Sequence, residues 1–512
     1  MSRADKAALI LSITAFVLVS FISRYIFENI PHIEDEMTYV WQAKVYSRYQ
    51  LGVPTPDCPK CFLVPFVIEN GGYRYSKYPP GWPAVLSLGL QVNARGFINP
   101  FLAALCVWLM YRLTAKFLKP WTAVLSAFLL VSSPFFLMNA SSLLSHTWSL
   151  FLSLVFIIAW LDSWNEAKVV PVWVAVLTSS IALGLLLLTR PLTAFAVSVP
   201  FALHGLFLWF KGSKSQKKFL FLFLFIIALF TATYLTWQNA LTGSLTTNPY
   251  VLYWPYDRIG FGPDVGLNPD GHTIKHAIDN TLFSLNYGSS DLLGWQGLSW
   301  LFLLPGIFAL RKKPHALLVS SVMASIILIY ALYWIGSWIL GPRYYYEGLI
   351  GALLLTTAGL EWSFNHTHPR LNLHFGNKKT TIQKVIVGVT AAIMIGINIF
   401  NYLPVRLAGL RGLYGITASQ LSFLQSDVVQ KLAPALIIIH PQDNWLEYGA
   451  LLEISSPYLD SPIVISYNRG TELNQVAADY LPDRLVLHYY PVLYPETLYS
   501  TPFPSVQTDN QD

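Results

Sequence analysis

Three consecutive carboxylates, Glu34, Asp35 and Glu36, follow the first long apolar stretch of the chain. Acids suit the N-terminus of a helix, where the helix dipole favours their ionised form, so one interpretation is that they only cap a helix. A carboxylate held at a membrane surface can also act as a general base towards an acceptor hydroxyl. The spacing alone leaves both interpretations open.

The residues that follow the acids, 38–49, are predicted to form a helix that lies on the membrane surface. Side chains recur there at helical spacing, at Tyr39, Val40, Ala43 and Tyr46. Trp41 and the tyrosines are typical of such an interface. The three carboxylates would then stand at the N-terminus of this helix.

A second motif, residues 76–83 (SKYPPGWP), contains Lys77 and ends the same polar segment. Its prolines restrict the backbone to a rigid, non-helical entry into the next apolar segment. Lys77 is thereby held near headgroup level, where an ammonium can pair with a lipid phosphate. A lysine that merely extends to the interface is an equally common explanation. Residues 81–92 are too short to cross a bilayer and are predicted to be re-entrant or interfacial.

Two arginines are predicted at the outer ends of membrane spans, where a charge calls for a partner. Arg343 can bind a phosphate through two parallel hydrogen bonds. An ion pair with Glu347, one helical turn away, explains Arg343 nearly as well. Arg190 is a further candidate of the same kind, with less support.

The elements that must position these residues are membrane helices. The chain has 512 residues, of which 54% are hydrophobic and 12% charged, with mean hydropathy +0.47. Soluble domains carry about 25% charged residues, so this composition argues against a soluble enzyme, a disordered chain and any nucleic-acid partner. The net charge of +6 therefore matters less than where the charges lie.

Apolar stretches long enough to cross a bilayer predict eleven spans. They lie at 7–27, 97–115, 121–161 (two spans, broken near 139–142), 170–189, 191–210, 219–240, 297–310, 315–336, 345–361 and 385–403. The fold class expected is an all-α polytopic membrane protein.

Basic residues predict the orientation, because they stay on the cytoplasmic side. With the N-terminus inside, each short basic cluster falls on the inner side: Lys116 with Lys119, residues 211–218, residues 311–313, and Arg370 with Lys378, Lys379 and Lys384. The expected location is the plasma (inner) membrane.

The chain is therefore divided into a membrane module, residues 1–403, and an extracytoplasmic domain, residues 404–512. The module has large outer loops at 28–80 and 241–296. Strand-like runs at 435–440, 462–466 and 484–488, with a helical stretch near 472–478, predict that the C-terminal domain is small and α/β.

Cysteine and histidine give weaker signals. Cys58 and Cys61 lie in the first outer loop, and the sequence allows either a disulfide between them or two free thiols. Cys106 lies within a predicted span and is interpreted as a core residue. No cofactor is certain, but His32 beside the three acids makes a divalent metal possible. His272 and His276, one helical turn apart, lack a carboxylate in register.

The two outer-loop motifs resemble those of the GT-C glycosyltransferases. In particular, they resemble the protein O-mannosyltransferase and aminoarabinose-transferase branch, including bacterial RgtA/B/C/D-like proteins. Residues 33–39 (IEDEMTY) look like its acidic motif and residues 76–83 like its second. Residues 189–193 (TRPLT) and 341–347 (GPRYYYE) resemble later segments.

The resemblance implies a polyprenyl-phosphate sugar donor and inverting transfer, on the outer face, to a lipid, glycan or protein acceptor. Asp35 matches the catalytic aspartate and Glu36 is its neighbour. Lys77 matches a phosphate-contacting lysine, and Arg343, Arg190 and Tyr345 are further phosphate ligands. The extra carboxylate Glu34 departs from the motif and, with His32, is an accessory candidate.

Two other functions compete with transfer. One is a transporter or flippase of lipid-linked sugars, and the other is a non-catalytic relative that binds such lipids among other membrane lipids. Transporters place charged groups at mid-membrane on broken helices. Here the predicted spans are almost free of charge and the acids gather on one outer face, which favours surface chemistry.

Overall fold

The computed structural model describes residues 1–164, 170–365, 372–375, 378–442 and 444–503. Contacts divide the chain into two compact units. The helical unit comprises Met1–Ile26, Pro79–Trp82 and Gly96–Leu410, and the mixed unit comprises Phe27–Tyr78, Pro83–Arg95 and Arg411–Asp512. The first predicted outer loop thus belongs to the same unit as the C-terminal residues.

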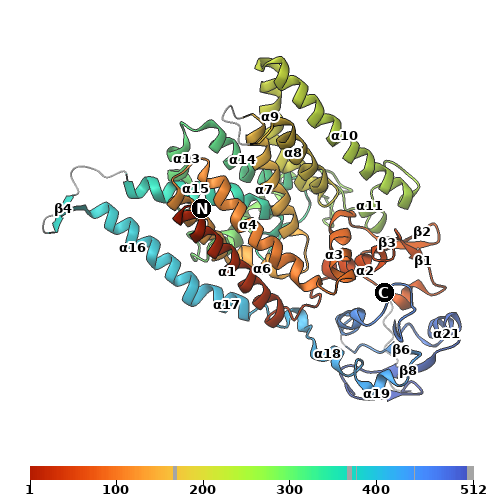
Figure 1. Ribbon diagram of the computed structural model, residues 1–512. Helices are drawn as coiled ribbons and strands as arrows, with labels where there is room; N and C mark the ends of the chain where they lie inside the picture. The colour runs from red at the N-terminus through yellow and green to blue at the C-terminus, as the bar shows by residue number, and fades with distance from the viewer. Residues whose placement is uncertain (165–169, 366–371, 376–377, 443, 504–512) are drawn as a thin grey trace. The chain divides into compact units, whose positions relative to one another are not determined.

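The helical unit is built from helices that pack side by side (Figure 1). They are α1 (Arg3–Tyr25), α4 (Ile98–Ala115), α5 (Pro120–Val131), α6 (Pro134–Ser141), α7 (His146–Ser163), α8 (Val172–Leu187), α9 (Pro191–Lys211), α10 (Lys214–Thr242), α11 (Pro249–Tyr253), α12 (Ile274–Asp291), α13 (Leu303–Leu310), α14 (Pro314–Tyr330), α15 (Leu349–Asn365), α16 (Ile382–Ile397) and α17 (Leu403–Ala408). Helix α1 packs against α4 and α5, α7 against α4 and α8, and α14 against α9 and α15.

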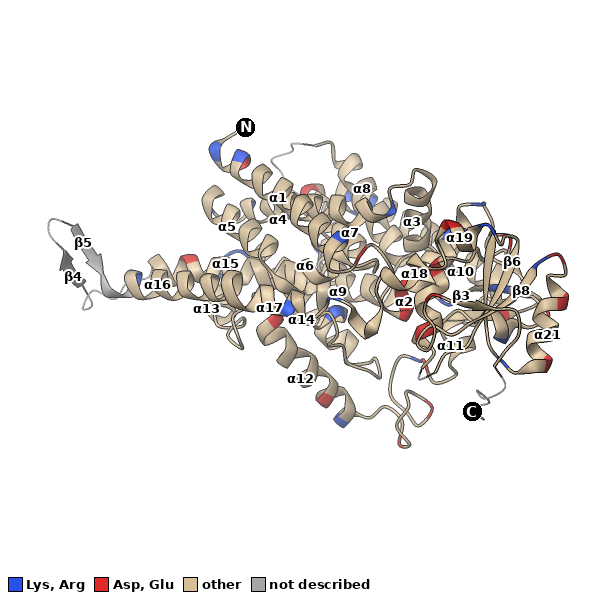
Figure 2. Ribbon diagram, turned by 90° about the horizontal axis from the view of Figure 1, so that it is seen from below, with Lys and Arg blue, Asp and Glu red and all other residues tan. Residues whose placement is uncertain are grey.

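The helical unit has the composition of a membrane protein. Within the described residues, six helices are long and apolar enough to cross a bilayer, or seven if α5 and α6, bent by 57°, form one span. Helices α8 and α14 are shorter but also apolar. Figure 2 shows few charged residues along the ribbons of these helices. The chain is an integral membrane protein.

Most predicted spans coincide with helices, but two segments differ. In 297–310 the helix, α13, begins only at Leu303 and has eight residues. It rises about 12 Å, whereas the hydrocarbon core is about 30 Å thick. In 121–161 an additional break precedes Pro134, which starts a new helix because proline fits the first helical turn. The count of eleven stays a prediction, and the predicted inner segment around Arg370 lies partly outside the described residues.

The mixed unit combines helices with two sheets. Its N-terminal part contains α2 (Glu34–Tyr46) and most of α3 (Gly81–Gln91), and its C-terminal part contains α18 (Ser419–Ser422), α19 (Asp427–Gln430), α20 (Leu446–Gly449) and α21 (Thr471–Tyr480). A small antiparallel sheet has the order β1 (Val53–Pro54), β3 (Tyr73–Ser76) and β2 (Val67–Asn70). The 3-10 helix η1 (Pro59–Phe62) lies between β1 and β2 in the sequence.

The second sheet of the mixed unit comes from the C-terminal residues. Its order is β7 (Ile463–Tyr467), β6 (Ala435–Ile439), β8 (Leu485–Tyr489) and β9 (Leu498–Tyr499), with β6 parallel to both β7 and β8. The three predicted strands agree with β6, β7 and β8 to within about a residue, and the predicted helix lies within α21 (Thr471–Tyr480). All five residues of β6 are buried, as expected for a central parallel strand.

Helix α2 is present as predicted, but its aromatic residues are not at a surface. Trp41 and Tyr39 are both 8% exposed. Trp41 packs with Val45, Val53, Val64 and Val67 in an apolar cluster. Their aromatic character therefore reflects the core of the mixed unit, and the interfacial reading of these two residues is wrong.

Candidate functional site

The three carboxylates stand in the first turn of α2, and Glu36 caps that helix. Its Oε2 accepts hydrogen bonds from the backbone N–H groups of His32, at 2.8 Å, and Ile33, at 3.3 Å. These amides precede the first turn, where the helix offers them no carbonyl partner. The capping interpretation therefore applies to Glu36, which is 2% exposed.

Asp35 has a different partner. The hydroxyl of Tyr78 donates a hydrogen bond to Oδ1 of Asp35 at 2.5 Å. The Tyr78 ring lies 4.7 Å from the ring of Tyr39 and meets the ring of Phe66 edge-on at 5.8 Å, centroid to centroid. This packing fixes the tyrosine, and through it the orientation of the Asp35 carboxylate.

Lys77 is held beside the same tyrosine. Its side chain is buried, and Nζ lies 4.0 Å from the centroid of Phe66 and 5.5 Å from that of Tyr78. The backbone N–H of Lys77 donates to the carbonyl of Phe66 at 2.9 Å. A cation over an aromatic face is attracted by the ring and loses little mobility on binding an anion. The mixed unit thus places a buried ammonium and the Asp35 carboxylate around one aromatic pair.

Glu34 completes the acidic motif and is half-buried. Burial raises the pKa of Glu34, and the neighbouring charge of Asp35 adds to this effect, while the ammonium of Lys77 partly offsets it. The extra carboxylate therefore favours protonation more than an ordinary glutamate does.

His32 is buried, and its Nδ1 lies 3.0 Å from the carbonyl oxygen of Ile30. Among the residues that the structure describes, no group of three or more His, Cys, Asp or Glu side chains could hold a metal ion. Cys58 and Cys61 form a disulfide, and Cys106 is a buried free thiol.

Arg190 lies in the helical unit at the N-cap of α9. Its Nη1 is 3.8 Å from Oε1 of Glu347, which is fully buried, and its Nη2 donates to the Tyr330 hydroxyl at 3.2 Å. That hydroxyl is also 2.6 Å from Oγ1 of Thr193. Arg190 is therefore oriented by the C-terminal end of α14 and by the segment that precedes α15.

Arg343 and Tyr345 lie on the 3-10 helix η3 (Arg343–Gly348). The Arg343 guanidinium is 5.7 Å from the ring centroid of Tyr344, and the Tyr345 ring is 6.4 Å from that of Tyr330. Glu347 forms an ion pair with Arg190.

Gly81, near the end of the second motif, contacts the residues just before Arg190 within the helical unit. The backbone N–H of Gly81 donates to the carbonyl of Leu188 at 2.8 Å. A Cβ at Gly81 would lie 2.4 Å from Oγ1 of Thr189, so only glycine allows this approach. The contact places the entry of α3 against the residues that lead into Arg190.

The structure thus sorts the predicted residues into two groups. Glu34, Asp35, Glu36, His32 and Lys77 lie in the mixed unit, and Arg190, Arg343 and Tyr345 lie in the helical unit.

Three aromatic residues that hold these groups were missed. Tyr78 adjoins Lys77 in the second motif, which is the only signal that could have suggested it. Phe66 lies outside both motifs, and Tyr330 binds Arg190, which is 140 positions away, so neither residue has a signal in the sequence.

Comparisons with known proteins show which solved structures have a similar fold. No family model and no curated protein sequence matches the chain. Among solved structures, ArnT from Cupriavidus metallidurans bound to undecaprenyl phosphate matches with a TM-score of 0.58 and 13% identity, over 94% of this chain and 89% of that one. The same protein in the apo state matches with a TM-score of 0.54 and 13% identity, over 93% and 88%.

A second solved structure agrees with the first. The archaeal oligosaccharyltransferase AglB from Archaeoglobus fulgidus, in complex with an inhibitory peptide and a dolichol-phosphate, matches with a TM-score of 0.51 and 13% identity. The match covers 93% of this chain and 69% of that one. Both proteins are GT-C glycosyltransferases. The chain has the GT-C fold. The resemblance of the short motifs is therefore matched by a likeness of fold over nearly the whole chain.

Proposed function

We propose that the chain is an integral membrane glycosyltransferase that uses a polyprenyl-phosphate sugar as donor. The observation that carries the proposal is the setting of Asp35 in a chain with the GT-C fold. Asp35 lies in the first turn of a capped helix and accepts a hydrogen bond from Tyr78, whose ring is beside the buried Lys77. The two solved relatives are bound to undecaprenyl phosphate and to a dolichol-phosphate, which supports a lipid phosphate as the donor carrier.

The proposed reaction is a single displacement at the anomeric carbon. Asp35 accepts the proton of an acceptor hydroxyl while the oxygen of that hydroxyl forms the bond to the anomeric carbon. The bond from the carbon to the phosphate oxygen breaks, and polyprenyl phosphate leaves with the electron pair. Attack from the opposite face inverts the configuration, through a transition state of oxocarbenium character.

Charge on the departing phosphate needs cationic partners. Lys77 is proposed to supply one, because its ammonium is buried and held by two aromatic rings. Arg343 and Arg190 are proposed as further phosphate ligands, with Tyr345 as a hydroxyl donor. Preorganised donors of this kind stabilise developing charge because they need not reorient during the reaction. Glu36, as the helix cap, supports Asp35 rather than replacing it.

The proposal includes an orientation. Eleven spans with the N-terminus in the cytoplasm put residues 28–80 and the C-terminal α/β region, residues 404–512, on the extracytoplasmic face. The basic clusters support this orientation. The acceptor is then a hydroxyl of a lipid, a glycan or a protein that is exposed on that face.

The test is transfer by the purified chain in nanodiscs supplied with labelled polyprenyl-phosphate sugars and a membrane extract as acceptor source. We expect consumption of a donor, and we expect Asp35→Asn to lower the rate by at least about 100-fold, since general-base catalysis contributes that much. Asparagine keeps the acceptor oxygen for Tyr78, so the fold should be retained.

Glu34→Gln is the matched control, because it removes the adjacent carboxylate and should leave most of the rate. Full activity in Asp35→Asn would exclude Asp35 as the base. Movement of the lipid across the bilayer with no consumption of any donor would favour a flippase instead.

A further inference from the structure

The C-terminal residues belong to the mixed unit, as does the loop that carries Asp35. Cys58, Cys61 and Phe62 form one apolar cluster with Leu436, Val464 and Ala477. Met37, on α2, forms another with Ile416 and Ala450. These clusters join residues that are more than 350 positions apart in the sequence. The C-terminal region is therefore part of the support of helix α2.

Polar contacts fix the segment that leads into α2. Nη1 of Arg95 lies 2.9 and 3.1 Å from the two carboxylate oxygens of Glu453, and both side chains are largely buried. Nη2 of the same arginine donates to the carbonyl of Asn29 at 2.8 Å. Glu453 thus orients Arg95, which binds the backbone six residues before Asp35.

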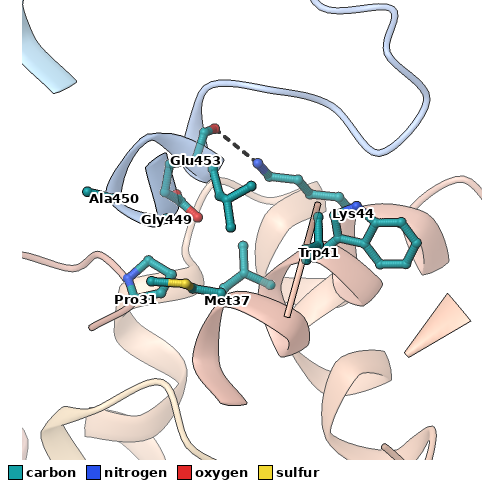
Figure 3. Close-up of a pocket in the computed structure, with 10 residues that line it drawn as sticks. Pro31, Met37, Trp41, Lys44, Gly449, Ala450 and Glu453 are labelled. Atoms are coloured by element: carbon teal, nitrogen blue, oxygen red, sulfur yellow. Dashed lines mark hydrogen bonds between the residues drawn. The ribbon is translucent and has the colours of Figure 1, made fainter. Parts of the chain in front are cut away.

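Other contacts fix the opposite end of the helix. Nζ of Lys44, in the last turn of α2, donates to the carbonyls of Glu453, at 3.0 Å, and Ser455, at 3.2 Å. Figure 3 shows Lys44 reaching from α2 to Glu453 beside Trp41 and Met37. A pocket at this contact is lined by residues of α2 and by residues 449–453.

Charged groups are a costly way to stabilise a protein interior. Desolvation cancels much of the attraction of a buried ion pair, and apolar side chains of similar size often stabilise as well. What charged hydrogen bonds add is direction, because each requires a particular distance and angle. Burial alone would raise the pKa of Glu453, but Arg95 and Lys44 outweigh it and lower the pKa, so the carboxylate stays ionised.

We propose that Glu453, Arg95 and Lys44 are positioning residues that hold both ends of helix α2 and thereby set the place of Asp35. This inference rests on the proposed function of Asp35. The C-terminal region then positions the loop that carries Asp35, through residues that do not contact the reacting atoms.

The test compares Glu453→Gln with an exposed ion pair that joins the same two parts of the chain. Glu453→Gln should lower kcat about 10-fold or more and leave the KM for the labelled polyprenyl-phosphate sugar within about 2-fold, because Asp35 is displaced while donor contacts remain. Arg95→Lys keeps the charge but loses the forked geometry, so it should lower kcat to a smaller extent.

Asp460→Asn is the matched control. Asp460 pairs with Arg48 across the same two segments, but both side chains are about half exposed, and exposed pairs contribute little. This variant should keep its kcat. A folded Glu453→Gln protein with unchanged kcat, or with a raised KM and unchanged kcat, would overturn the proposal.

Hydrogen exchange tests the positioning role of Glu453 and Arg95 independently of the proposed glycosyltransferase activity. In Glu453→Gln and in Arg95→Lys, amides of α2 should exchange faster while amides of α1 stay unchanged, whether or not a donor has been found. Unchanged exchange in α2 would contradict the positioning role even in an inactive preparation. If Glu453→Gln fails to fold, Arg95→Lys provides the same comparison.

Discussion

At the scale of single residues, three neighbouring carboxylates have three different environments. Glu36 binds two backbone amides, Asp35 accepts a hydrogen bond from Tyr78, and burial raises the pKa of Glu34. Among the three, Asp35 is oriented by an aromatic side chain, that of Tyr78. The rings of Tyr39 and Phe66 hold Tyr78 in place. This supports Asp35 as the proposed base.

The Tyr78 hydroxyl gives a direct test of that support. Tyr78→Phe keeps the ring that packs on Tyr39 and Phe66 but removes the hydrogen bond to Asp35. Hydrogen bonds to charged groups contribute about 1.5–3 kcal/mol, so we expect kcat to fall about 10-fold or more with the fold intact. The measurement is transfer of the labelled sugar, with Tyr75→Phe as control. An unchanged kcat would show that the hydroxyl does not orient the base.

At the scale of elements, the strands β6, β7 and β8 were predicted to within about a residue. Helix α2 was predicted over residues 38–49 and is found at Glu34–Tyr46, so that the acids form its first turn. Each of these elements is a run long enough for its own periodicity or apolar character to identify it. The sheet of β1, β2 and β3 was not predicted, because strands of two to four residues have too few side chains to form a pattern. Helix α13 is shorter than predicted because hydropathy alone does not show where a helix starts.

The C-terminal sheet contains a pH-sensitive pair. Nε2 of His440, directly after β6, lies 2.9 Å from Nδ1 of His488 in β8. Burial, with the charge of His488, lowers the pKa of His440 from its usual 6.5 to about 4. Between these two values the unfolded state binds more protons, so stability is fully present above pH 6.5 and is lost as the pH falls towards 4.

We therefore expect β6 and β8 to lose protection from hydrogen exchange between pH 6.5 and 4. The loss should reach at most about 1.4 kcal/mol per pH unit. His440→Gln removes this titration, so the variant should show a flatter profile at the same pH values. His276→Gln, at a half-buried histidine of the helical unit, should follow the unmodified chain. Parallel profiles for all three proteins would contradict the prediction.

At the scale of the whole molecule, the arrangement of charge determines the proposed orientation. The clusters of lysine and arginine lie in short segments between apolar helices, and such segments stay in the cytoplasm. The acidic motif and the C-terminal residues would then face the opposite side.

Labelling of introduced cysteines tests this orientation. Ser215→Cys, within the basic cluster at the start of α10, should be protected from an impermeant maleimide in intact cells, because it is predicted to be cytoplasmic. Glu472→Cys, on α21, should be labelled. Both positions are exposed in the structure, and after the cells are lysed both should react. Labelling of Ser215→Cys in intact cells would reverse the topology.

The sequence by itself determined the features that depend on neighbouring residues. These are the apolar runs that make the chain a membrane protein, the two short motifs, the helix after the acids, and the parallel strands. Such features follow from the local pattern, because the bilayer thickness and the backbone period act over 5 to 25 residues.

Only the tertiary structure decided which carboxylate caps α2, that Arg190 pairs with Glu347, and that Cys58 is joined to Cys61. It also decided that residues 27–78 and the C-terminal residues form one unit. Glu453 contacts Arg95 across more than 350 residues of chain, and no local pattern encodes such a contact. It is determined by the shapes of the surfaces that pack together, and these exist only once the chain has folded.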